Sequence, residues 1–117
     1  MAGVYDLAIE QGATFKVIFQ WTDANNTPIN ITGYSARSQI RPTIESATVM
    51  VDATIANGKL SIVNPATDGK VQLLLSATDT AALASGTAVW DLELVAGDGT
   101  VTRLLQGSVT ISPEVTR

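Results

Sequence analysis

Large apolar side chains alternate with other residues along residues 13–21, ATFKVIFQW. In an extended chain successive side chains point to opposite faces, so one face of this stretch carries the largest apolar groups, Phe15, Val17, Phe19 and Trp21. The opposite face carries Lys16, Ile18 and Gln20. The pattern predicts a half-buried β-strand, and the size of its apolar groups places this strand at the centre of the core.

The same two-residue period recurs along the chain and predicts an all-β fold. In YSARSQIR, residues 34–41, Tyr34 and Ile40 share one face, and the strand ends at Pro42, which lacks an amide hydrogen. Further strands are predicted at 4–9, 59–63, 70–75, 87–95 and 100–111. Residues 43–58 fit either one bent strand or two short ones before an Asn57-Gly58 turn.

A single helix is predicted within SATDTAALASG, residues 76–86. Ser76 and Asp79 have the spacing of a capping box with the shorter carboxylate, and Gly86 provides a stop signal. We expect about two helical turns that cross between two sheets.

Residue usage agrees with this pattern, since Thr, Val and Ile account for 35 of the 117 residues and favour strands. The length suits one domain, residues 1–117, with residues 113–117 as a short C-terminal tail. The predicted fold is an immunoglobulin-like antiparallel β-sandwich of seven or eight strands with one short crossover helix. A small β-barrel is the alternative.

Composition argues against several classes of function. A net charge of −4 repels phosphate backbones and anionic membranes, so neither nucleic acid nor a membrane is an expected partner. The absence of Cys excludes disulfides and thiolate zinc sites. The first residues, MAGVYDLAIE, lack the basic and apolar regions of a signal peptide, and no apolar run is long enough to span a membrane.

Asp91 and Glu93 are the strongest catalytic candidates. They lie two positions apart in AVWDLEL, so on a strand they share a face, at a separation of roughly 6.5 Å that a glycoside hydrolase could use. The alternative is that they form the solvent side of the strand. If the hairpin turn is Gly97-Asp98-Gly99, Glu93 faces Arg103 in a cross-strand ion pair, whereas a two-residue turn places Leu94 there. We expect no catalysis here.

Other catalytic, metal and cofactor signals are weak or missing. The chain has no His, which removes the commonest general base and a common metal ligand. No phosphate-binding glycine motif and no calcium loop motif occurs, and the Asp23 segment is expected to form an Asx-type turn. The sequence therefore predicts no enzyme, no metal and no cofactor.

The basic residues on predicted outward faces are the candidates for contact with other subunits: Lys16, Arg37, Arg41 and Arg103. Trp21 and Trp90 fall on inward faces and are expected to pack in the core rather than stack on a ligand. Charged residues make up only 15% of the chain, below the roughly 25% usual for soluble domains, which is consistent with a surface covered by other proteins.

Three stretches, QGATFKVIFQW, NITGYSARSQIRP and VWDLELVAGDGTVTRLLQGSVTISPEVT, together resemble a known family. They are similar to short virion-associated proteins encoded in the tail region of tailed bacteriophages and prophages, and to the immunoglobulin-like N-terminal domain of phage upper baseplate proteins. The resemblance extends from Tyr5 to Thr116 and is mostly one of strand and turn pattern.

The resemblance implies a structural protein that docks on the tail or baseplate and helps carry tail fibres or receptor-binding proteins. Its partners would be other virion proteins, in a homo-oligomer or a symmetric multi-copy assembly, within a particle assembled in the bacterial cytoplasm. No coiled-coil or fibre-binding extension is visible before Arg117, which leaves open a stand-alone accessory subunit. The alternatives are a capsid-surface decoration (cement) protein, a carbohydrate-binding β-sandwich and a hydrolase.

Overall fold

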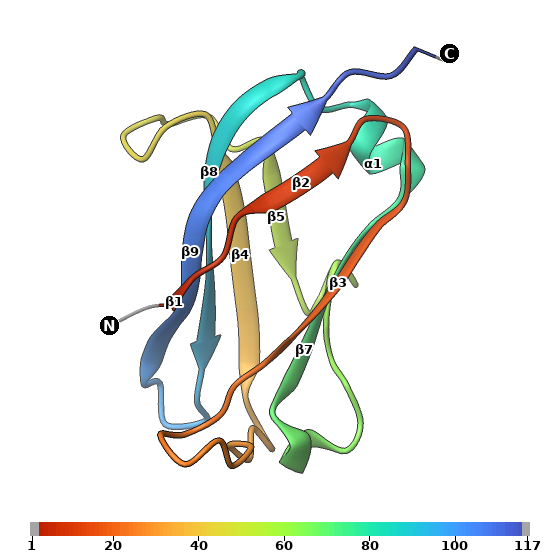
Figure 1. Ribbon diagram of the computed structural model, residues 1–117. Coiled ribbons are helices and arrows are strands. Elements are labelled where there is room, and N and C mark those ends of the chain that lie inside the picture. Colours follow the sequence, from red (N-terminus) through yellow and green to blue (C-terminus); the bar gives the residue numbers. More distant parts are fainter. Residues whose placement is uncertain (1–2, 116–117) are drawn as a thin grey trace.

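The computed structural model, which describes residues 3–115, is an immunoglobulin-like β-sandwich of two facing sheets (Figure 1). The larger sheet has the order β1-β9-β8-β4-β5, with β2 also paired to β9, and the smaller has the order β3-β7-β6. The strands are β1 (Gly3–Val4), β2 (Leu7–Glu10), β3 (Phe15–Gln20), β4 (Ser35–Arg41), β5 (Val51–Thr54), β6 (Leu60–Ile62), β7 (Lys70–Leu75), β8 (Gly86–Val95) and β9 (Val101–Ser112). A short 3₁₀ helix, η1 (Ala66–Asp68), precedes β7, and the helix α1 (Ala77–Ala81) follows it.

The N-terminal edge of the larger sheet differs from the prediction. The expected strand at 4–9 is broken into β1 and β2, and both pair with β9 in parallel, so the sheet is mixed rather than wholly antiparallel. Tyr5 and Asp6 form the break. Here the Trp90 indole donates a hydrogen bond to the Tyr5 carbonyl oxygen at 2.7 Å, and the Asp6 carboxylate accepts one from the Ser108 amide at 3.0 Å. These side-chain bonds add to the backbone bond from the Tyr5 amide to the Gln106 carbonyl oxygen at 3.0 Å, so residues 5 and 6 stay attached to β9 where the regular pairing is interrupted.

The alternation along β3 is confirmed, and the strand contributes Phe19 to the core, although it is less central there than predicted. Phe19 is buried and Phe15 and Val17 are partly buried, while Lys16, Ile18 and Gln20 are exposed. The strand nevertheless lies at the edge of the smaller sheet. Because β2 pairs with β9 in the larger sheet, no other strand of the described chain flanks β3 opposite β7.

The hairpin between β8 and β9 has the three-residue turn that places Glu93 opposite Arg103. The Ala96 amide donates to the Thr100 carbonyl oxygen at 2.8 Å, which closes the turn. Gly99 adopts a φ of 92°, a left-handed conformation that glycine tolerates best. The conditional cross-strand register is therefore confirmed.

The helix begins with the predicted capping box but is shorter than two turns. The Ser76 hydroxyl accepts from the Asp79 amide at 3.1 Å, and the Asp79 carboxylate accepts from the Ser76 amide at 3.0 Å. The helix links β7 in one sheet to β8 in the other, as expected. In the ambiguous segment 43–58, only β5 is a strand, and residues 42–50 form a loop before it.

One hydrophobic core fills the space between the sheets. Phe19 from the smaller sheet stacks on Trp90 from the larger one, with ring centroids 5.4 Å apart. Leu73, Leu92 and Val109 are fully buried beside them. Among the described residues, no helix has the length and apolar character needed to span a membrane.

Candidate functional site: a polar groove on the larger sheet

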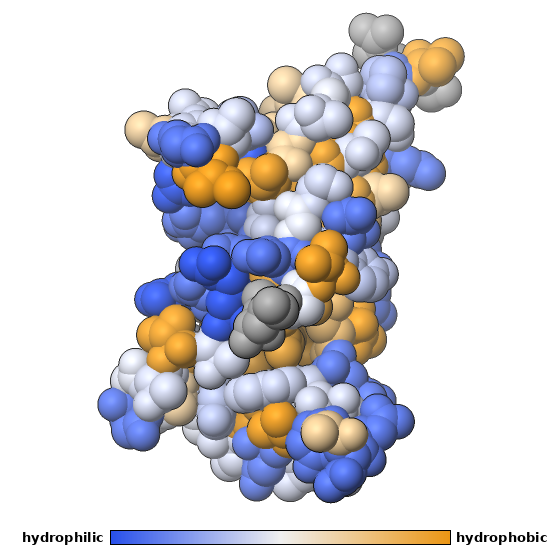
Figure 2. All heavy atoms as spheres, turned by 60° about the vertical axis from the view of Figure 1, so that its left-hand side comes forward, coloured by the Kyte–Doolittle hydropathy of each residue, from blue (hydrophilic) through white to orange (hydrophobic). Residues whose placement is uncertain are grey.

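The outer face of the larger sheet is hollowed into a groove of about 880 Å³. Side chains of β4, β5, β8 and β9 form its floor, and β1 with the residues after it forms one wall. Figure 2 shows hydrophilic side chains gathered across the middle of this face, with hydrophobic groups above and below them. The volume falls within the range of small-ligand sites, roughly 300–1,000 Å³.

Strand register arranges the polar side chains of the floor in rows that run across the sheet. The first row crosses four strands and consists of Thr54, Arg37, Glu93 and Arg103. The second row consists of Asp52, Gln39, Asp91 and Gln106. Residues directly opposite each other on neighbouring strands lie close enough to interact, so each row forms a chain of potential hydrogen bonds and ion pairs.

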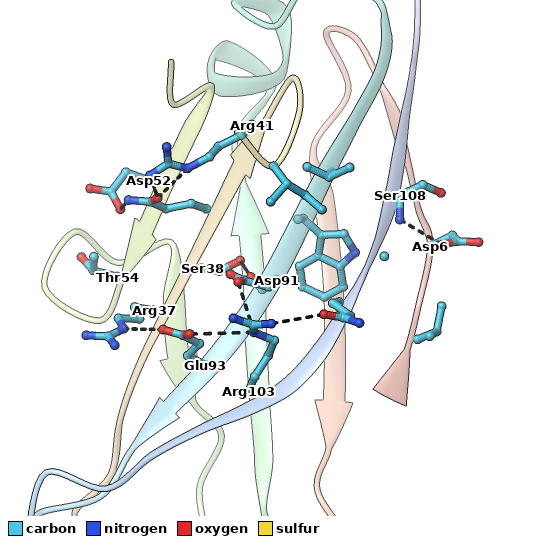
Figure 3. A pocket seen from close by; sticks show the side chains of 17 residues that line it. Asp6, Arg37, Ser38, Arg41, Asp52, Thr54, Asp91, Glu93, Arg103 and Ser108 are labelled. Atoms are coloured by element: carbon cyan, nitrogen blue, oxygen red, sulfur yellow. Dashed lines mark hydrogen bonds and ion pairs between the residues drawn. The ribbon is translucent and has the colours of Figure 1, made fainter. Parts of the chain in front are cut away.

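Two arginines pair with the two acids in what we call the ion-pair lattice: Arg37, Asp91, Glu93 and Arg103 (Figure 3). The Arg37 Nε lies 2.7 Å from Glu93 Oε1. The Arg103 Nε lies 3.6 Å from Asp91 Oδ2 and 4.0 Å from Glu93 Oε2. Both arginine side chains are more than half exposed, so each pair contributes about 1 kcal/mol at most to stability.

The two acids have different environments. Burial raises the pKa of Asp91 above its usual value, and the neighbouring Glu93 carboxylate adds to this, while Arg103 opposes it. Glu93 contacts both arginines, of which Arg37 is the closer. An acid with a raised pKa beside a second carboxylate is a pattern also found in glycoside hydrolases. Here, however, one guanidinium, that of Arg103, lies within 4.0 Å of both carboxylates, so the two acids belong to a cross-strand ion-pair network.

The four basic residues that were predicted as subunit contacts do not form one surface. Arg37, Arg41 and Arg103 line the groove, whereas Lys16 lies on β3 of the smaller sheet. Arg41 donates to the Ser46 carbonyl oxygen at 2.6 Å and to Gln39 Oε1 at 2.7 Å. It therefore holds the loop before β5 against the sheet. The subunit-contact role of all four residues remains a prediction.

Sequence reasoning missed the wall of the groove, which includes Val4, Asp6 and Gly107 on one side and Ile44 on the other. Val4 and Ile44 are 75% and 80% exposed, so the polar floor lies between two projecting apolar side chains. Gly107 could have indicated this wall from the sequence, because a glycine inside a strand pattern often marks a close approach by another backbone segment. A Cβ atom on Gly107 would lie 2.2 Å from the Tyr5 carbonyl oxygen.

Aromatic side chains do not line the groove with exposed rings. Trp90 is only 4% exposed and packs in the core, as predicted. Trp21 and Tyr34 pack edge to face, with ring centroids 6.1 Å apart, and both are half-buried. Tyr5 is 45% exposed but is not among the groove-lining residues. The stacking platform expected of a sugar-binding module is therefore not found at the groove.

The Asp23 segment forms the predicted Asx-type turn. Asp23 Oδ1 accepts hydrogen bonds from the amides of Asn25, at 2.9 Å, and Thr27, at 3.0 Å. The Asp23 carboxylate thus accepts hydrogen bonds from backbone amides of its own turn.

Comparison with known proteins gives a distant structural likeness. No protein-family model matches the chain, and no curated protein matches it. Among solved structures, the chain is similar to CopC from Methylosinus trichosporium OB3b, with a TM-score of 0.49 and 13% sequence identity. The alignment covers 95% of this chain and 89% of that one. At this identity and TM-score the likeness carries nothing about function.

Proposed function

We propose that this protein is a non-enzymatic structural subunit of a tailed-bacteriophage particle. It docks on the tail or baseplate through the groove face of its larger sheet and acts as an attachment or accessory module for tail fibres or receptor-binding proteins. The sequence resemblance described above supports the phage assignment. The physical support for docking comes from the groove itself.

The observation that carries the docking proposal is the ion-pair lattice. Its two arginines and two acids are partly exposed and are already paired across three strands, so these charges are partly ordered before any partner arrives. Pre-ordered charges lower the ordering cost of binding and favour partners with complementary potential. The exposed Val4 and Ile44 side chains beside the lattice add apolar area that a neighbouring protein would bury.

Filling the groove tests this proposal. Gln106 is an exposed groove residue on β9, so Gln106→Trp should fold and place an indole where the partner would dock. We expect its incorporation into particles to fall about tenfold, equivalent to about 1.4 kcal/mol of docking free energy. The matched control is Thr110→Trp, because Thr110 is exposed on the same strand but lies outside the groove. Equal incorporation of the two variants would contradict docking through the groove.

Copy number separates a tail or baseplate subunit from a capsid decoration protein. Quantitative mass spectrometry of purified particles should give a handful to a few dozen copies for a tail location. Hundreds of copies would favour the capsid alternative. Particles that lack the protein would contradict the structural proposal as a whole.

Glycan binding is the second candidate: the volume and hydrogen-bonding lining of the groove support it, and the lack of an exposed aromatic ring at the groove counts against it. Titration of the purified protein with oligosaccharides, followed by amide chemical shifts, tests it. Shifts confined to β4, β8 and β9 would support glycan binding. If the groove also catalysed hydrolysis, the double variant Asp91→Asn with Glu93→Gln would abolish turnover; a structural subunit has no turnover to lose.

A further inference from the structure

The outer edge of β3 carries no paired strand in the described part of the chain. Because β2 joins β9 in the opposite sheet, β3 pairs only with β7. The loop that follows β3 turns away from this edge, since the Ile29 amide donates to the Trp21 carbonyl oxygen on the β7 side. Figure 1 shows β3 crossing the front of the sandwich diagonally, beside β7.

Hydrogen-bond alternation identifies which residues of β3 face this edge. The Trp21 amide donates to the Gly69 carbonyl oxygen at 2.8 Å, and the β3–β7 register continues from that pair in steps of one residue. Backbone groups of an antiparallel strand point alternately toward and away from its neighbour. The odd-numbered residues therefore bond to β7, and Lys16, Ile18 and Gln20 direct their amide and carbonyl groups outward.

The side chains of β3 also match an edge that is covered by another chain. Ile18 is 46% exposed on the outer face, although it lies in the middle of the strand. Phe15 and Val17, on the inner face, are only partly buried. Natural edge strands are often protected by Pro, bulges or several charges, but this one has a regular register and a single charge, Lys16.

We propose that two copies of this chain associate by antiparallel pairing of β3 with β3, with the twofold axis at Ile18. In this register Ile18 faces Ile18 of the second copy, and Lys16 faces Gln20 of the second copy. Each facing pair exchanges two backbone hydrogen bonds, giving about six in all. The smaller sheets of the two copies, each β3-β7-β6, become one continuous sheet.

Charge and apolar burial select this register over its neighbours. Here the two Lys16 side chains lie about 13 Å apart along the strands, and the two exposed isoleucines cover each other. A shift of two residues in one direction would place Lys16 opposite Ile18 and Gln20 opposite a residue outside β3. A shift of two in the other direction would place Gln20 opposite Ile18 and Lys16 opposite a residue outside β3. A shift of four residues in one direction would place the two lysines directly opposite each other, which is destabilising.

This pairing goes beyond the proposed function and stands without it, because it concerns a different sheet and a second copy of the same chain. A subunit that dimerises through β3 leaves the groove face free for another protein. Loss of dimerisation and loss of particle incorporation are separate measurements, so either proposal can fail alone.

Sedimentation equilibrium of the purified full chain over a range of concentrations provides the first test. We expect a monomer–dimer equilibrium, and Ile18→Arg should weaken association at least tenfold because it places like charges on the twofold axis. The matched control is Gln72→Arg, which adds the same charge directly beside Ile18 on the interior strand β7. A monomer at all concentrations, or a dimer unaffected by Ile18→Arg, would overturn the proposal.

Cross-linking provides a second test that does not depend on the stability of Ile18→Arg. The chain has no cysteine, so Ile18→Cys introduces the only thiol. Facing residues of a hydrogen-bonded antiparallel pair have Cα atoms about 5.5 Å apart, within disulfide range. Oxidation should give a covalent dimer of Ile18→Cys and leave Lys16→Cys monomeric. Preferential cross-linking of Lys16→Cys, or none by Ile18→Cys, would overturn the register.

Discussion

Substitution of Gly107 by Ala should detach the N-terminal edge of the larger sheet and remove one wall of the groove. A Cβ atom at this position would lie 2.2 Å from the Tyr5 carbonyl oxygen and 2.8 Å from its carbonyl carbon. Contacts under 3.0 Å are essentially never seen for real Cβ atoms, so the Tyr5 carbonyl would have to retreat by about 0.8 Å. The obstacle is backbone, so a side-chain rotation cannot relieve it.

Three hydrogen bonds depend on this close approach. The Tyr5 amide donates to the Gln106 carbonyl oxygen at 3.0 Å, the Trp90 indole donates to the Tyr5 carbonyl oxygen, and the Asp6 carboxylate accepts from Ser108. At about 1 kcal/mol each, their loss costs about 3 kcal/mol. The Trp90 side chain is buried, so an indole N–H left without an acceptor adds to this cost.

Urea unfolding followed by tryptophan fluorescence measures the effect. Gly97→Ala is the matched control, because a Cβ there meets nothing closer than 4.0 Å, and it should change the free energy of unfolding by less than about 0.5 kcal/mol. Gly107→Ala should also cost less in a Trp90→Phe background, which already lacks the indole bond. A Gly107→Ala protein as stable as Gly97→Ala would refute this account of the strand break.

Three further substitutions test individual parts of the structure. Because the folded-state pKa of Asp91 is raised, its ionised form destabilises the fold at neutral pH. Asp91→Asn should therefore raise the free energy of unfolding at pH 7 by roughly a few tenths of a kcal/mol. Urea unfolding at several pH values should show this gain disappear below about pH 4. Ser76→Ala should cost about 1 kcal/mol. The Ser76 amide, the largest cause of the lowered pKa of Asp79, is retained in this variant, so NMR titration should show that pKa rise only by the smaller contribution of the lost hydroxyl. The stability that Asp79 contributes is present above its unfolded-state pKa and is lost as the pH falls. The buried Thr80 hydroxyl accepts a hydrogen bond from the Gly12 amide at 3.0 Å and donates one to the Ala13 carbonyl oxygen at 2.8 Å. Thr80→Val loses both bonds and should lower the free energy of unfolding by about 2 kcal/mol. Thr80→Ser keeps the hydroxyl and should retain most of the stability in thermal melting.

Local sequence patterns predicted the features that depend on local geometry. The two-residue period identified the inward and outward faces of β3 and β4, the turn residues allowed the β8–β9 register, and Ser76 with Asp79 gave the helix start. Each of these follows from backbone periodicity or from bonds within a few residues.

The choice of neighbouring strand could not be predicted in the same way. Alternation in residues 7–9 shows that Leu7 and Ile9 are buried, but it is the same whether the strand pairs with β3 or with β9. The parallel pairing of β2 with β9 therefore escaped prediction, and with it the open edge of β3 and the wall of the groove. The candidate acids were placed correctly on an outer face, but the walls that convert that face into a groove come from residues distant in sequence, such as Val4 and Ile44.

A density map of a purified phage particle that contains this chain tests the proposed function most directly. We predict that the face carrying Arg37, Asp91, Glu93 and Arg103 lies against another virion protein of the tail or baseplate, with density filling the groove beside Gln106. A particle in which this face is open to solvent, or in which the chain is missing, would contradict the proposal.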